Sequence, residues 1–529
     1  MNNTRAKSIC FVAFVFLSLA IANPVLSATH CVSTASELST ALSTATNNGE
    51  DDIIRVRQGT YNGNFIYAST EAFGVTIEGG YTDGCTSRVV DPTNTEIDAN
   101  LNGTPLALST PILQSNFSIE GLTIKNGNSS GSHTSGLYIN TEAGDVRITN
   151  TIITNNKSEI GLYGLTIENA RNILLENNLV TENGGEDGNA IRINSRNSPN
   201  VKLINNEISD NVGNGFLVMV TGSVEVTNNI ILNNGTFGIG GGGGAGISAD
   251  TILFDRNYIT KNESWNGGGV AIQGINDTYT AVFSNNTIIG NSAKAATGGA
   301  LIGKISSGSK IVINNNVIAY NTCDRHGGLG INQYGPDHST PSEINVINNT
   351  IYGNESLGLD GGGLYLTIEH DNTLAYIYNN IILENSAVNG DDLLIMNDHD
   401  NNFFPATVLA FNNNFDQSGG GTFIQIPFTI DPSNLNNIDP LFVDSDNDDY
   451  HLTADSPLID KGNNSAPELP DKDKDGKPRI IDGDYDGISY VDIGAYEYGS
   501  PRGDLDGDGD VDGEDLRIFA ESYGTYVGP

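Results

Sequence analysis

A pair of asparagines, followed by apolar residues and then by a further asparagine, recurs along the middle of the chain. Clear copies are LENNLVTEN (175–183), INNEISDN (204–211), TNNIILNN (227–234), SNNTIIGN (284–291), NNNVIAYN (314–321), INNTIYGN (347–354) and YNNIILEN (378–385). The second asparagine of each pair, or its equivalent, falls at 150, 178, 206, 229, 257, 286, 316, 349, 380 and 413. These positions lie about 29 residues apart on average, and self-similarity at such a period indicates stacked repeat units.

Each repeat also contains a glycine-rich turn that opens a short run of alternating residues. Examples are SGLYI (135–139), YGLTI (163–167), GNGFLV (213–218), GGGVAI (267–272), GGLGI (327–331) and GGGLYL (361–366). Alternation with a period of two predicts β-strands. Units this short cannot bury their apolar faces alone and must stack on their neighbours. Leucine-rich repeats use a different leucine spacing, and propeller blades are longer, at about 40–50 residues. We therefore predict an all-β fold, a right-handed parallel β-helix (solenoid) over residues 111–435.

Asparagine repeated at one turn position suits an internal ladder, in which each side-chain amide bonds to the next coil. Glycine supplies the unusual backbone angles at the other turn. The combination of asparagine repeats with Gly-Gly-apolar turns resembles surface β-helix proteins, including bacterial adhesin-like repeats and the pectate-lyase-like superfamily. This resemblance covers residues 111–435 and implies the fold, but it does not indicate one function.

The N-terminus has the features of a secretory signal peptide. Arg5 and Lys7 precede an apolar run from Ile9 to Ala22, and small residues follow it. A positive region, a short apolar region and small residues are typical of a cleaved signal. We therefore expect residues 1–28 to be removed and the protein to be secreted, extracellular or on the cell surface. No later segment reaches the length of about 20 apolar residues that a transmembrane helix needs.

Residues 29–110 are expected to form an N-terminal cap and the first strands. Thr34 to Glu37 match a capping box, and apolar residues follow at helical spacing, at Leu38, Ala41, Leu42 and Ala45. The stretch from Cys31 to residue 88 resembles the N-terminal cap of secreted bacterial β-helix proteins. In an oxidising compartment two of the three mature cysteines can pair. Cys31 and Cys85 flank the first folded segment and are the expected disulfide, which leaves Cys323 as a small buried residue.

Residues 436–499 are predicted to form a small acidic C-terminal domain. The stretches IDPLFVD (438–444), DYHLTADSPLIDKGN (449–463) and VDIGAYEY (491–498) resemble the choice-of-anchor Q domain. In that family the domain follows β-helical repeats and precedes surface-retention signals, so the resemblance implies an extracellular or envelope location. The string Asp471, Asp473, Asp475, Gly476 and Asp482 has the spacing of a calcium loop, but it fits an acidic turn as well.

Residues 500–529 contain the strongest chemical motif, DLDGDGDVDGED at 504–515. Acidic side chains at loop positions 1, 3, 5, 9 and 12 and the backbone carbonyl at position 7 place oxygen ligands around one calcium ion, with glycine at position 6 for the sharp turn. The predicted calcium ligands are Asp504, Asp506, Asp508, Asp510, Asp512 and Asp515. The loop and the helix expected at 516–524 resemble half of a type I dockerin. Dockerins carry two such halves and only one stands here, so cohesin is not an expected partner.

The charge of the chain limits the classes of partner that it can bind. It has 25 Lys and Arg against 64 Asp and Glu, a formal net charge of -39. Binding to nucleic acid needs a basic face that neutralises phosphates, so nucleic acid is excluded as an electrostatic partner. A strongly acidic chain favours cations instead, and calcium is the expected cofactor.

Catalytic candidates come from acids that precede the glycine-led strands of successive coils. Asp324, Asp360 and Asp391 stand at such places, with His326 beside the first of them. Coils stack about 4.8 Å apart, so carboxylates one or two coils apart would span the separations of about 5–10 Å that glycosidases use. The same acids could hold calcium, and turns before glycine favour aspartate without any catalytic role.

Outward positions on the glycine-led strands supply candidate ligand-binding residues. Tyr138, Arg192 and Tyr365 should lie in one row on a sheet face, together with Thr166, Leu217 and Ala271. Tyrosine rings can stack on sugar rings, and an arginine fork can hold a hydroxyl pair or a carboxylate. We therefore predict a calcium-stabilised, glycan-binding or adhesion-like protein whose partner is an extracellular polysaccharide or a cell-surface glycan. A polysaccharide lyase or glycoside hydrolase is the alternative, and a purely structural surface protein is the third interpretation.

Overall fold

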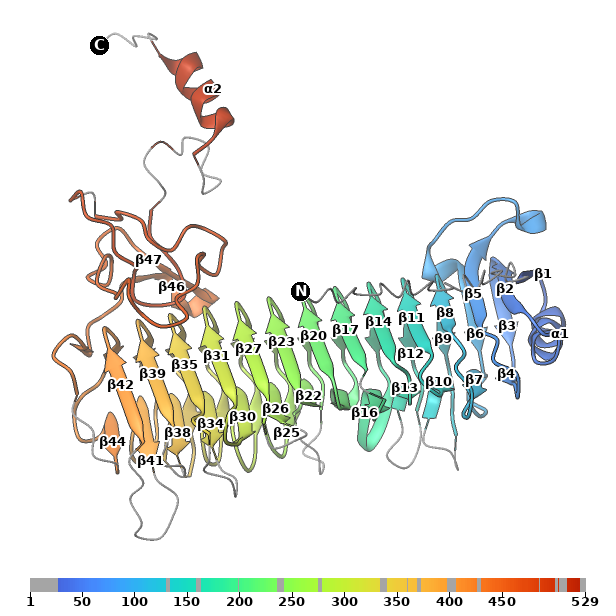
Figure 1. Cartoon of the computed structure of the whole chain (residues 1–529), viewed down its shortest axis with the longest axis horizontal. Coiled ribbons are helices and arrows are strands. Elements are labelled where there is room, and N and C mark those ends of the chain that lie inside the picture. The colour runs from blue at the N-terminus through green and yellow to red at the C-terminus, as the bar shows by residue number, and fades with distance from the viewer. Residues whose placement is uncertain are drawn as a thin grey trace, which may run out of the picture.

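Three long parallel sheets run the length of the molecule and enclose its core (Figure 1). The computed structural model describes residues 27–129, 134–157, 163–197, 199–235, 242–274, 278–333, 340–358, 360–368, 373–396, 406–425, 430–484, 486–499, 503 and 511–523. Every strand of these sheets pairs in parallel with the strand one coil away. The predicted right-handed parallel β-helix is therefore confirmed.

Counted over the described residues, here and for sheets 2 and 3, sheet 1 has 14 strands: β1 (Ser27–Val32), β2 (Asp51–Arg57), β5 (Val75–Tyr81), β8 (Phe117–Glu120), β11 (Asp145–Thr149), β14 (Asn172–Glu176), β17 (Asn200–Ile204), β20 (Ser223–Thr227), β23 (Thr251–Asp255), β27 (Thr280–Ser284), β31 (Lys310–Asn314), β35 (Glu343–Ile347), β39 (Leu374–Tyr378) and β42 (Thr407–Phe411). Sheet 2 has 13 strands: β4 (Phe65–Ala68), β7 (Leu106–Thr110), β10 (Thr134–Thr141), β13 (Tyr163–Glu168), β16 (Gly184–Ser195), β19 (Val212–Val220), β22 (Ala245–Ala249), β26 (Val270–Gly274), β30 (Ala300–Ile305), β34 (Leu329–Gln333), β38 (Leu364–Ile368), β41 (Leu393–Met396) and β44 (Thr422–Ile424).

Sheet 3 has 14 shorter strands: β3 (Gly59–Asn62), β6 (Thr95–Asp98), β9 (Thr123–Lys125), β12 (Ile152–Thr154), β15 (Leu179–Thr181), β18 (Glu207–Ser209), β21 (Ile230–Leu232), β24 (Tyr258–Thr260), β28 (Thr287–Ile289), β32 (Val317–Ala319), β36 (Thr350–Tyr352), β40 (Ile381–Leu383), β43 (Asn414–Phe415) and β45 (Leu435–Asn436). A small four-stranded sheet lies between sheets 3 and 2 along the chain: β25 (Glu263–Ser264), β29 (Ser292–Ala293), β33 (Thr322–Cys323) and β37 (Glu355–Ser356).

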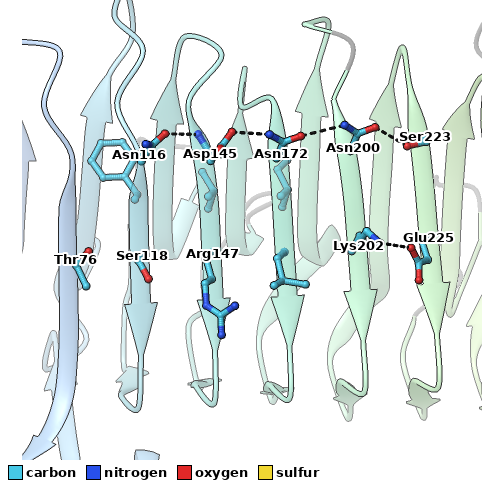
Figure 2. A pocket seen from close by; sticks show the side chains of 14 residues that line it. Thr76, Asn116, Ser118, Asp145, Arg147, Asn172, Asn200, Lys202, Ser223 and Glu225 are labelled. Atoms are coloured by element: carbon cyan, nitrogen blue, oxygen red, sulfur yellow. Dashed lines mark hydrogen bonds and ion pairs between the residues drawn. The ribbon is translucent and has the colours of Figure 1, made fainter. Parts of the chain in front are cut away.

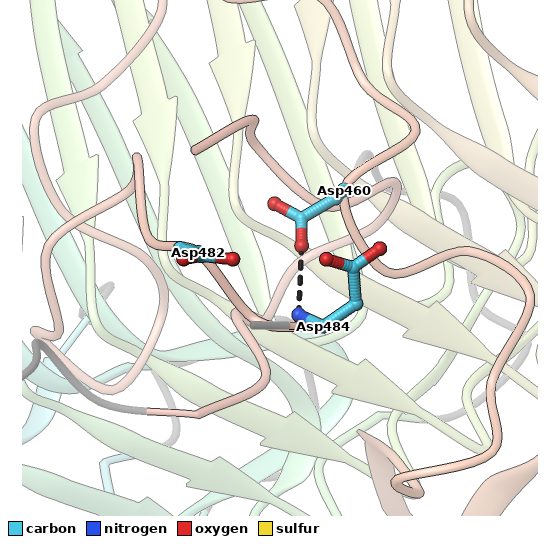
Figure 3. A group of neighbouring side chains, drawn as sticks. All are labelled: Asp460, Asp482 and Asp484. Atoms are coloured by element: carbon cyan, nitrogen blue, oxygen red, sulfur yellow. Dashed lines mark hydrogen bonds between the residues drawn. The ribbon is translucent and has the colours of Figure 1, made fainter. Parts of the chain in front are cut away.

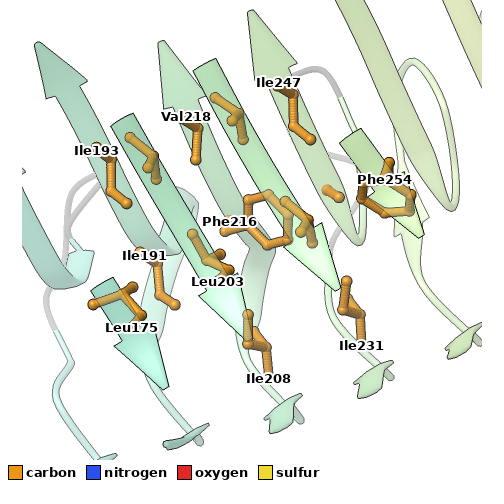
Figure 4. Packing of buried hydrophobic residues seen from close by; sticks show 14 of the residues in the cluster. Leu175, Ile191, Ile193, Leu203, Ile208, Phe216, Val218, Ile231, Ile247 and Phe254 are labelled. Atoms are coloured by element: carbon orange, nitrogen blue, oxygen red, sulfur yellow. The ribbon is translucent and has the colours of Figure 1, made fainter. Parts of the chain in front are cut away.

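Alternate residues of each strand point into the core (Figure 4). Ile193, Val218 and Ile247 share one register position on sheet 2, and all three are at most 1% exposed. Phe254 and Phe283 stack one coil apart, with ring centroids 5.2 Å from each other. Because each coil covers the apolar face of the next, the core is continuous from the first coil to the last.

The predicted asparagine ladder is confirmed at the turn between sheets 1 and 3. In Asn286, for example, the backbone N–H and Nδ2 both donate to Oδ1 of Asn316, at 2.9 and 3.0 Å. Nδ2 also donates to the carbonyl of Phe254 at 2.9 Å. The residue before each ladder asparagine from Asn178 to Asn413 has a positive φ, as Asn285 does at 56°, which turns the chain sharply. The ladder comprises Asn178, Asn206, Asn229, Asn257, Asn286, Asn316, Asn349, Asn380, Asn413 and Asn434.

A second asparagine ladder runs five residues later in each coil, at the end of sheet 3. Its asparagines close every repeat motif, but the repeat pattern predicts only the first ladder. Its members are Asn156, Asn183, Asn211, Asn234, Asn262, Asn291, Asn321, Asn354 and Asn385. The ladder ends on Asp392, whose Oδ1 accepts from Nδ2 of Asn385 at 3.0 Å and whose Oδ2 accepts from the backbone N–H of Asp416 at 2.9 Å.

Asp392 makes stability depend on pH. Burial raises the pKa of its carboxyl from 3.8 to about 7, although the hydrogen bonds from Asp416 and Asn385 act in the opposite direction. Between these two values the folded state binds more protons than the unfolded state, so stability falls as pH rises. We expect the free energy of unfolding of the wild type, measured against that of Asp392→Asn, to decrease over this range. Denaturant titrations measure the free energy of unfolding of both proteins. If the difference between them does not change with pH, the burial of this carboxyl is contradicted.

The N-terminal end of the core is covered by helix α1 (Ala35–Ala45), as predicted. Leu38, Ala41, Leu42 and Ala45 are its buried residues. Thr34 caps the helix by accepting from the N–H of Glu37 at 3.2 Å, and the Glu37 carboxylate accepts from the N–H of Ser33 at 2.7 Å. The Cys31–Cys85 disulfide is confirmed, and Cys323 is a free, buried thiol.

The C-terminal segment (residues 436–499) packs on the outside of sheets 1 and 3 near their last strands (Figure 1). It consists mainly of turns around the antiparallel pair β46 (Phe442–Asp444) and β47 (Asp449–Leu452). In the last coils the first asparagine of the pair, which points away from the core, binds this segment. Nδ2 of Asn315, Asn348 and Asn412 donates to the carbonyls of Lys472, Asp492 and Lys461 at 2.7, 2.9 and 2.9 Å. The same repeat therefore builds both the internal ladder and an external docking surface.

Buried charges hold the C-terminal segment against the solenoid. Arg479 is 1% exposed. Its Nη1 donates to Glu497 at 2.6 Å and its Nη2 donates to Oδ1 of Asn315 at 2.6 Å. Lys474 donates from Nζ to the carbonyl of Asn285 at 2.6 Å, and burial lowers its pKa to about 8.

Helix α2 (Gly513–Ser522) follows the C-terminal segment. Within the described part of the chain, no helix is long and apolar enough to cross a membrane.

Candidate functional site

The outward residues of sheet 2 form one row along the solenoid, as the sequence predicts. Tyr138 pairs in register with Thr166, Thr166 with Arg192 and Arg192 with Leu217. The row continues through Gly246, Ala271, Leu301, Gly330 and Tyr365. All six predicted outward positions therefore share one line on the sheet face.

Two of the three predicted ligand-binding residues meet in one cavity of about 510 Å³ on this face. Tyr138 contributes from β10 and Arg192 from β16, two coils further on. Tyr163 and Glu168, at the two ends of β13, complete the group and were not singled out from the sequence. The remaining lining residues are Asn64, Ile66, Thr104, Ala107, Thr134 and Thr166.

The polar groups of this cavity orient one another. The Tyr138 hydroxyl donates to Oε2 of Glu168 at 2.9 Å. Nη1 of Arg192 donates to the Tyr163 hydroxyl at 2.8 Å, and the guanidinium lies 5.1 Å from the centroid of the Tyr163 ring. Nε of Arg192 is buried and has no hydrogen-bond partner among the residues that the structure describes. An unpaired buried donor costs free energy, so a ligand oxygen that reached it would be stabilised.

The electrostatics of Tyr138 suit binding better than proton abstraction. Burial, followed by the hydrogen bond to Glu168, raises the pKa of the phenol above its usual value. A general base needs a pKa near the working pH, so the shift is in the wrong direction for that role. The phenol stays neutral and can serve as a hydrogen-bond donor and as a flat apolar surface.

Tyr365 lies elsewhere, further along sheet 2 on β38. It is 9% exposed, and its ring stacks on the imidazole of His326 with centroids 3.6 Å apart. Nδ1 of His326 is 2.8 Å from the carbonyl oxygen of Asp360, which favours the tautomer with its proton on Nδ1. Burial lowers the pKa of His326 to about 4. The imidazole is therefore neutral at neutral pH and covers the Tyr365 ring.

The candidate catalytic acids occupy different register positions. Asp324 lies five residues before Leu329, Asp360 lies four before Leu364 and Asp391 lies two before Leu393. Leu329, Leu364 and Leu393 are paired in register, so the three aspartates do not stack above one another. Oδ1 of Asp360 accepts from Nδ2 of Asn389 at 2.7 Å, and Oδ1 of Asp391 accepts from the N–H of Ala387 at 2.8 Å. These two carboxylates thus stabilise turns.

Two of the predicted calcium ligands are described, and they cap helix α2. Asp512 accepts from the N–H of Glu514 at 2.7 Å, and Oδ2 of Asp515 accepts from the N–H of Asp512 at 2.6 Å. The other four predicted ligands, Asp504, Asp506, Asp508 and Asp510, lie outside the described residues.

The residues of the second acidic string, between Asp471 and Asp482, have two different roles. Asp473 accepts from the N–H groups of Asp475 and Lys477 at 3.0 and 2.8 Å, which is the bonding of an acidic turn. Asp482 instead joins Asp460 and Asp484 in a group whose carboxylate oxygens lie within 4.8 Å of one another (Figure 3). Such a group could hold a cation, but Oδ2 of Asp460 also accepts from the N–H of Asp484 at 2.9 Å, which is a structural use of the carboxylate.

Comparison with known proteins supports the fold. The family of the right-handed β-helix region matches residues 112–288, about a third of the chain. No curated protein matches the chain. Among solved structures, the chain is similar to a PL6 family alginate lyase, AlyGC, with 14% identity and a TM-score of 0.35. The alignment covers 77% of this chain and 55% of that one, so the chain spans about half the length of the lyase. A likeness at this level does not extend to a site or an activity.

Proposed function

We propose that the protein binds an extracellular polysaccharide at the sheet 2 cavity formed by Tyr138, Tyr163, Glu168 and Arg192. The observation that carries the proposal is the convergence of two tyrosines, a carboxylate and an arginine with a buried, unpaired Nε in one cavity of about 510 Å³. Aromatic faces beside a few fixed polar groups are typical of small-ligand sites. Sugars offer both an apolar ring face and hydroxyl groups to such a site.

Binding without cleavage is the favoured function. The pKa of Tyr138 is raised, and the candidate acids stand at different register positions. Glycoside hydrolysis needs two carboxyl groups in different protonation states facing one bond. The proposed activity is therefore adhesion-like retention of a polymer.

The proposal is tested by incubating the purified protein with a panel of acidic and neutral polysaccharides. Affinity electrophoresis measures retention, and reducing ends and unsaturated products report cleavage. We expect retention by at least one polymer, with no product. Product release that is lost in Asp360→Asn would favour the lyase or hydrolase alternative instead. No retention by any polymer would contradict the binding function.

We also propose that residues 504–515 bind one calcium ion and that the protein is secreted and retained at the cell surface. The acidic spacing of the loop and the apolar N-terminal segment support these two proposals. The helix that begins at Gly513, with Asp512 as its cap, is compatible with a calcium loop that leads into a helix.

Calcium titration of the full chain by calorimetry should show one tight site. Asp504→Ala combined with Asp515→Ala should abolish it, because two of the six predicted oxygen donors are lost and a hard cation needs six to eight. Asp460→Asn serves as the control, since it alters the separate acidic group. If the site persists in the double variant and disappears in the control, the calcium ion belongs to the Asp460 group.

A further inference from the structure

Sheet 1 carries a second and larger hollow, of about 630 Å³, over β5 to β20 (Figure 2). Its floor is an outward row of sheet 1 that contains Ser118, Arg147, Leu174, Lys202 and Glu225. The hollow spans six neighbouring strands, each about 4.8 Å from the next. It is therefore an elongated groove that runs along the solenoid axis, on a different face from the sheet 2 cavity.

A ladder of polar side chains borders this groove (Figure 2). Nδ2 of Asn172 donates to Oδ1 of Asp145 at 2.8 Å, Nδ2 of Asn200 donates to Oδ1 of Asn172 at 3.0 Å, and the Ser223 hydroxyl donates to Oδ1 of Asn200 at 2.8 Å. Unlike the two internal ladders, this one faces solvent, and Asn200 is exposed. Each amide keeps one N–H for a ligand, because only one of its two N–H groups is used by the ladder.

The charges lining the groove are balanced, in contrast to the chain as a whole. Asp145 lies 3.1 Å from Nη2 of Arg171, and Glu225 lies 2.6 Å from Nζ of Lys202. Arg147 has only a distant contact with Glu176, at 3.9 Å, and its side chain is 51% exposed. In a chain with a net charge of -39, a groove of balanced charge does not concentrate cations and has no electrostatic preference for a charged polymer.

We propose that this groove binds a single extended chain of a neutral, hydroxyl-rich polysaccharide. The amides of Asn172 and Asn200, one coil apart, can bond neighbouring sugar hydroxyls, and Leu174 offers an apolar surface to a ring at the centre of the floor. The C-terminal segment already covers the far end of sheet 1, where Ala466 and Leu469 pack against Tyr378 and Tyr376. The described residues of the C-terminal segment do not line the groove in the N-terminal half of the same face.

Two binding faces on one rigid solenoid would let a molecule bridge two polymer chains. Binding in the sheet 1 groove does not depend on the sheet 2 cavity, whereas bridging rests on the function proposed for that cavity. The protein would then act as a cross-linker of an extracellular matrix as well as a binder.

The groove is tested in the Arg192→Ala background, which removes the guanidinium of the sheet 2 cavity. Soluble glucan, mannan and xylan are titrated calorimetrically against this variant and against the same variant with Asn172→Ala, Leu174→Ala and Asn200→Ala. We expect at least one polymer to bind the Arg192→Ala protein, and the added substitutions to weaken binding about tenfold or more, because several hydrogen bonds and an apolar contact are lost. Leu253→Ala, one coil beyond the groove in the same row, should leave the affinity unchanged.

Arg147→Ala provides a second variant that cannot disturb the core, and it should weaken binding severalfold.

Light scattering with a long polymer should rise for the wild type but not for either single-face variant. The proposal is overturned if no neutral polymer binds the Arg192→Ala protein, or if the groove substitutions leave the affinity unchanged. Sedimentation provides a further check: a dimer that the groove substitutions dissociate would make the groove an interface between copies of this chain. If the wild type binds polymer in the groove but does not bridge polymer chains, the result counts against the sheet 2 cavity and not against the groove.

Discussion

Replacing Asn206 with alanine is expected to lower the free energy of unfolding by about 3–5 kcal/mol. Asn206 is 3% exposed. Its Nδ2 donates to the Leu175 carbonyl and to Oδ1 of Asn229, at 2.9 and 3.0 Å, and its Oδ1 accepts from the backbone and side chain of Asn178 at 3.0 and 2.9 Å. Alanine would remove the partner that this side chain gives to the Leu175 carbonyl and to the Asn178 N–H, both buried in the preceding coil, and each unsatisfied group costs about 1–3 kcal/mol.

The adjacent Asn205 provides the matched control. It is exposed and has a positive φ of 54°, a conformation that glycine adopts without strain. Asn205→Gly should therefore change stability by less than about 1 kcal/mol. Urea unfolding followed by circular dichroism measures both variants. Equal effects at the two positions would mean that the ladder contributes no more than the turn beside it.

Replacing Arg479 with methionine is expected to release the C-terminal segment from the solenoid. The free energy that holds the segment in place should fall by about 3–5 kcal/mol. Burial, followed by the nearby Asp492, raises the pKa of Glu497 well above its usual value, and Arg479 acts in the opposite direction. Without the guanidinium, the Glu497 carboxyl would lose its buried ion pair, and Oδ1 of Asn315 would lose its donor. The segment should then unfold before the solenoid, as a separate calorimetric transition.

Hydrogen exchange localises the effect of this substitution. Amides of residues 436–499 should exchange faster in Arg479→Met, while those of the sheet 1 strands should not. Lys310→Met is the control, because Lys310 joins the solenoid to Glu468 by an ion pair in which both side chains are about 40% exposed. Exposed pairs contribute about 0–1 kcal/mol, so its exchange pattern should stay that of the wild type. A single cooperative transition in Arg479→Met would show that the segment and the solenoid unfold together.

The fold follows from the sequence because its constraints are local and repeated. Each coil needs the same turn, and Asn206 or Asn286 occupies the same place in its own repeat. The outward row of sheet 2 follows from the same logic, since alternation within a strand fixes which residues face outward. For this reason the repeat pattern alone is enough to place Tyr138 and Arg192 on the same face.

Features that depend on contacts between distant parts of the chain could not be predicted in this way. The stacking of His326 on Tyr365 depends on a turn folding over the sheet, which alternation does not encode. The candidate acids are predicted from the approximate number of residues between each acid and the strand that follows it. Differences of one or two residues in that number give Asp360 and Asp391 different register positions. The docking of the C-terminal segment on Asn315 and Asn348 joins residues more than a hundred positions apart.

Calorimetric isotherms of the wild type and Arg192→Ala, with the polymer that the panel identifies, test whether the sheet 2 cavity binds a polysaccharide. Arg196→Ala is the matched control, because this exposed arginine belongs to the same coil and does not line the cavity. We predict that Arg192→Ala weakens binding about tenfold or more, and that Arg196→Ala binds as the wild type does. Equal affinities for the wild type and Arg192→Ala would contradict the account.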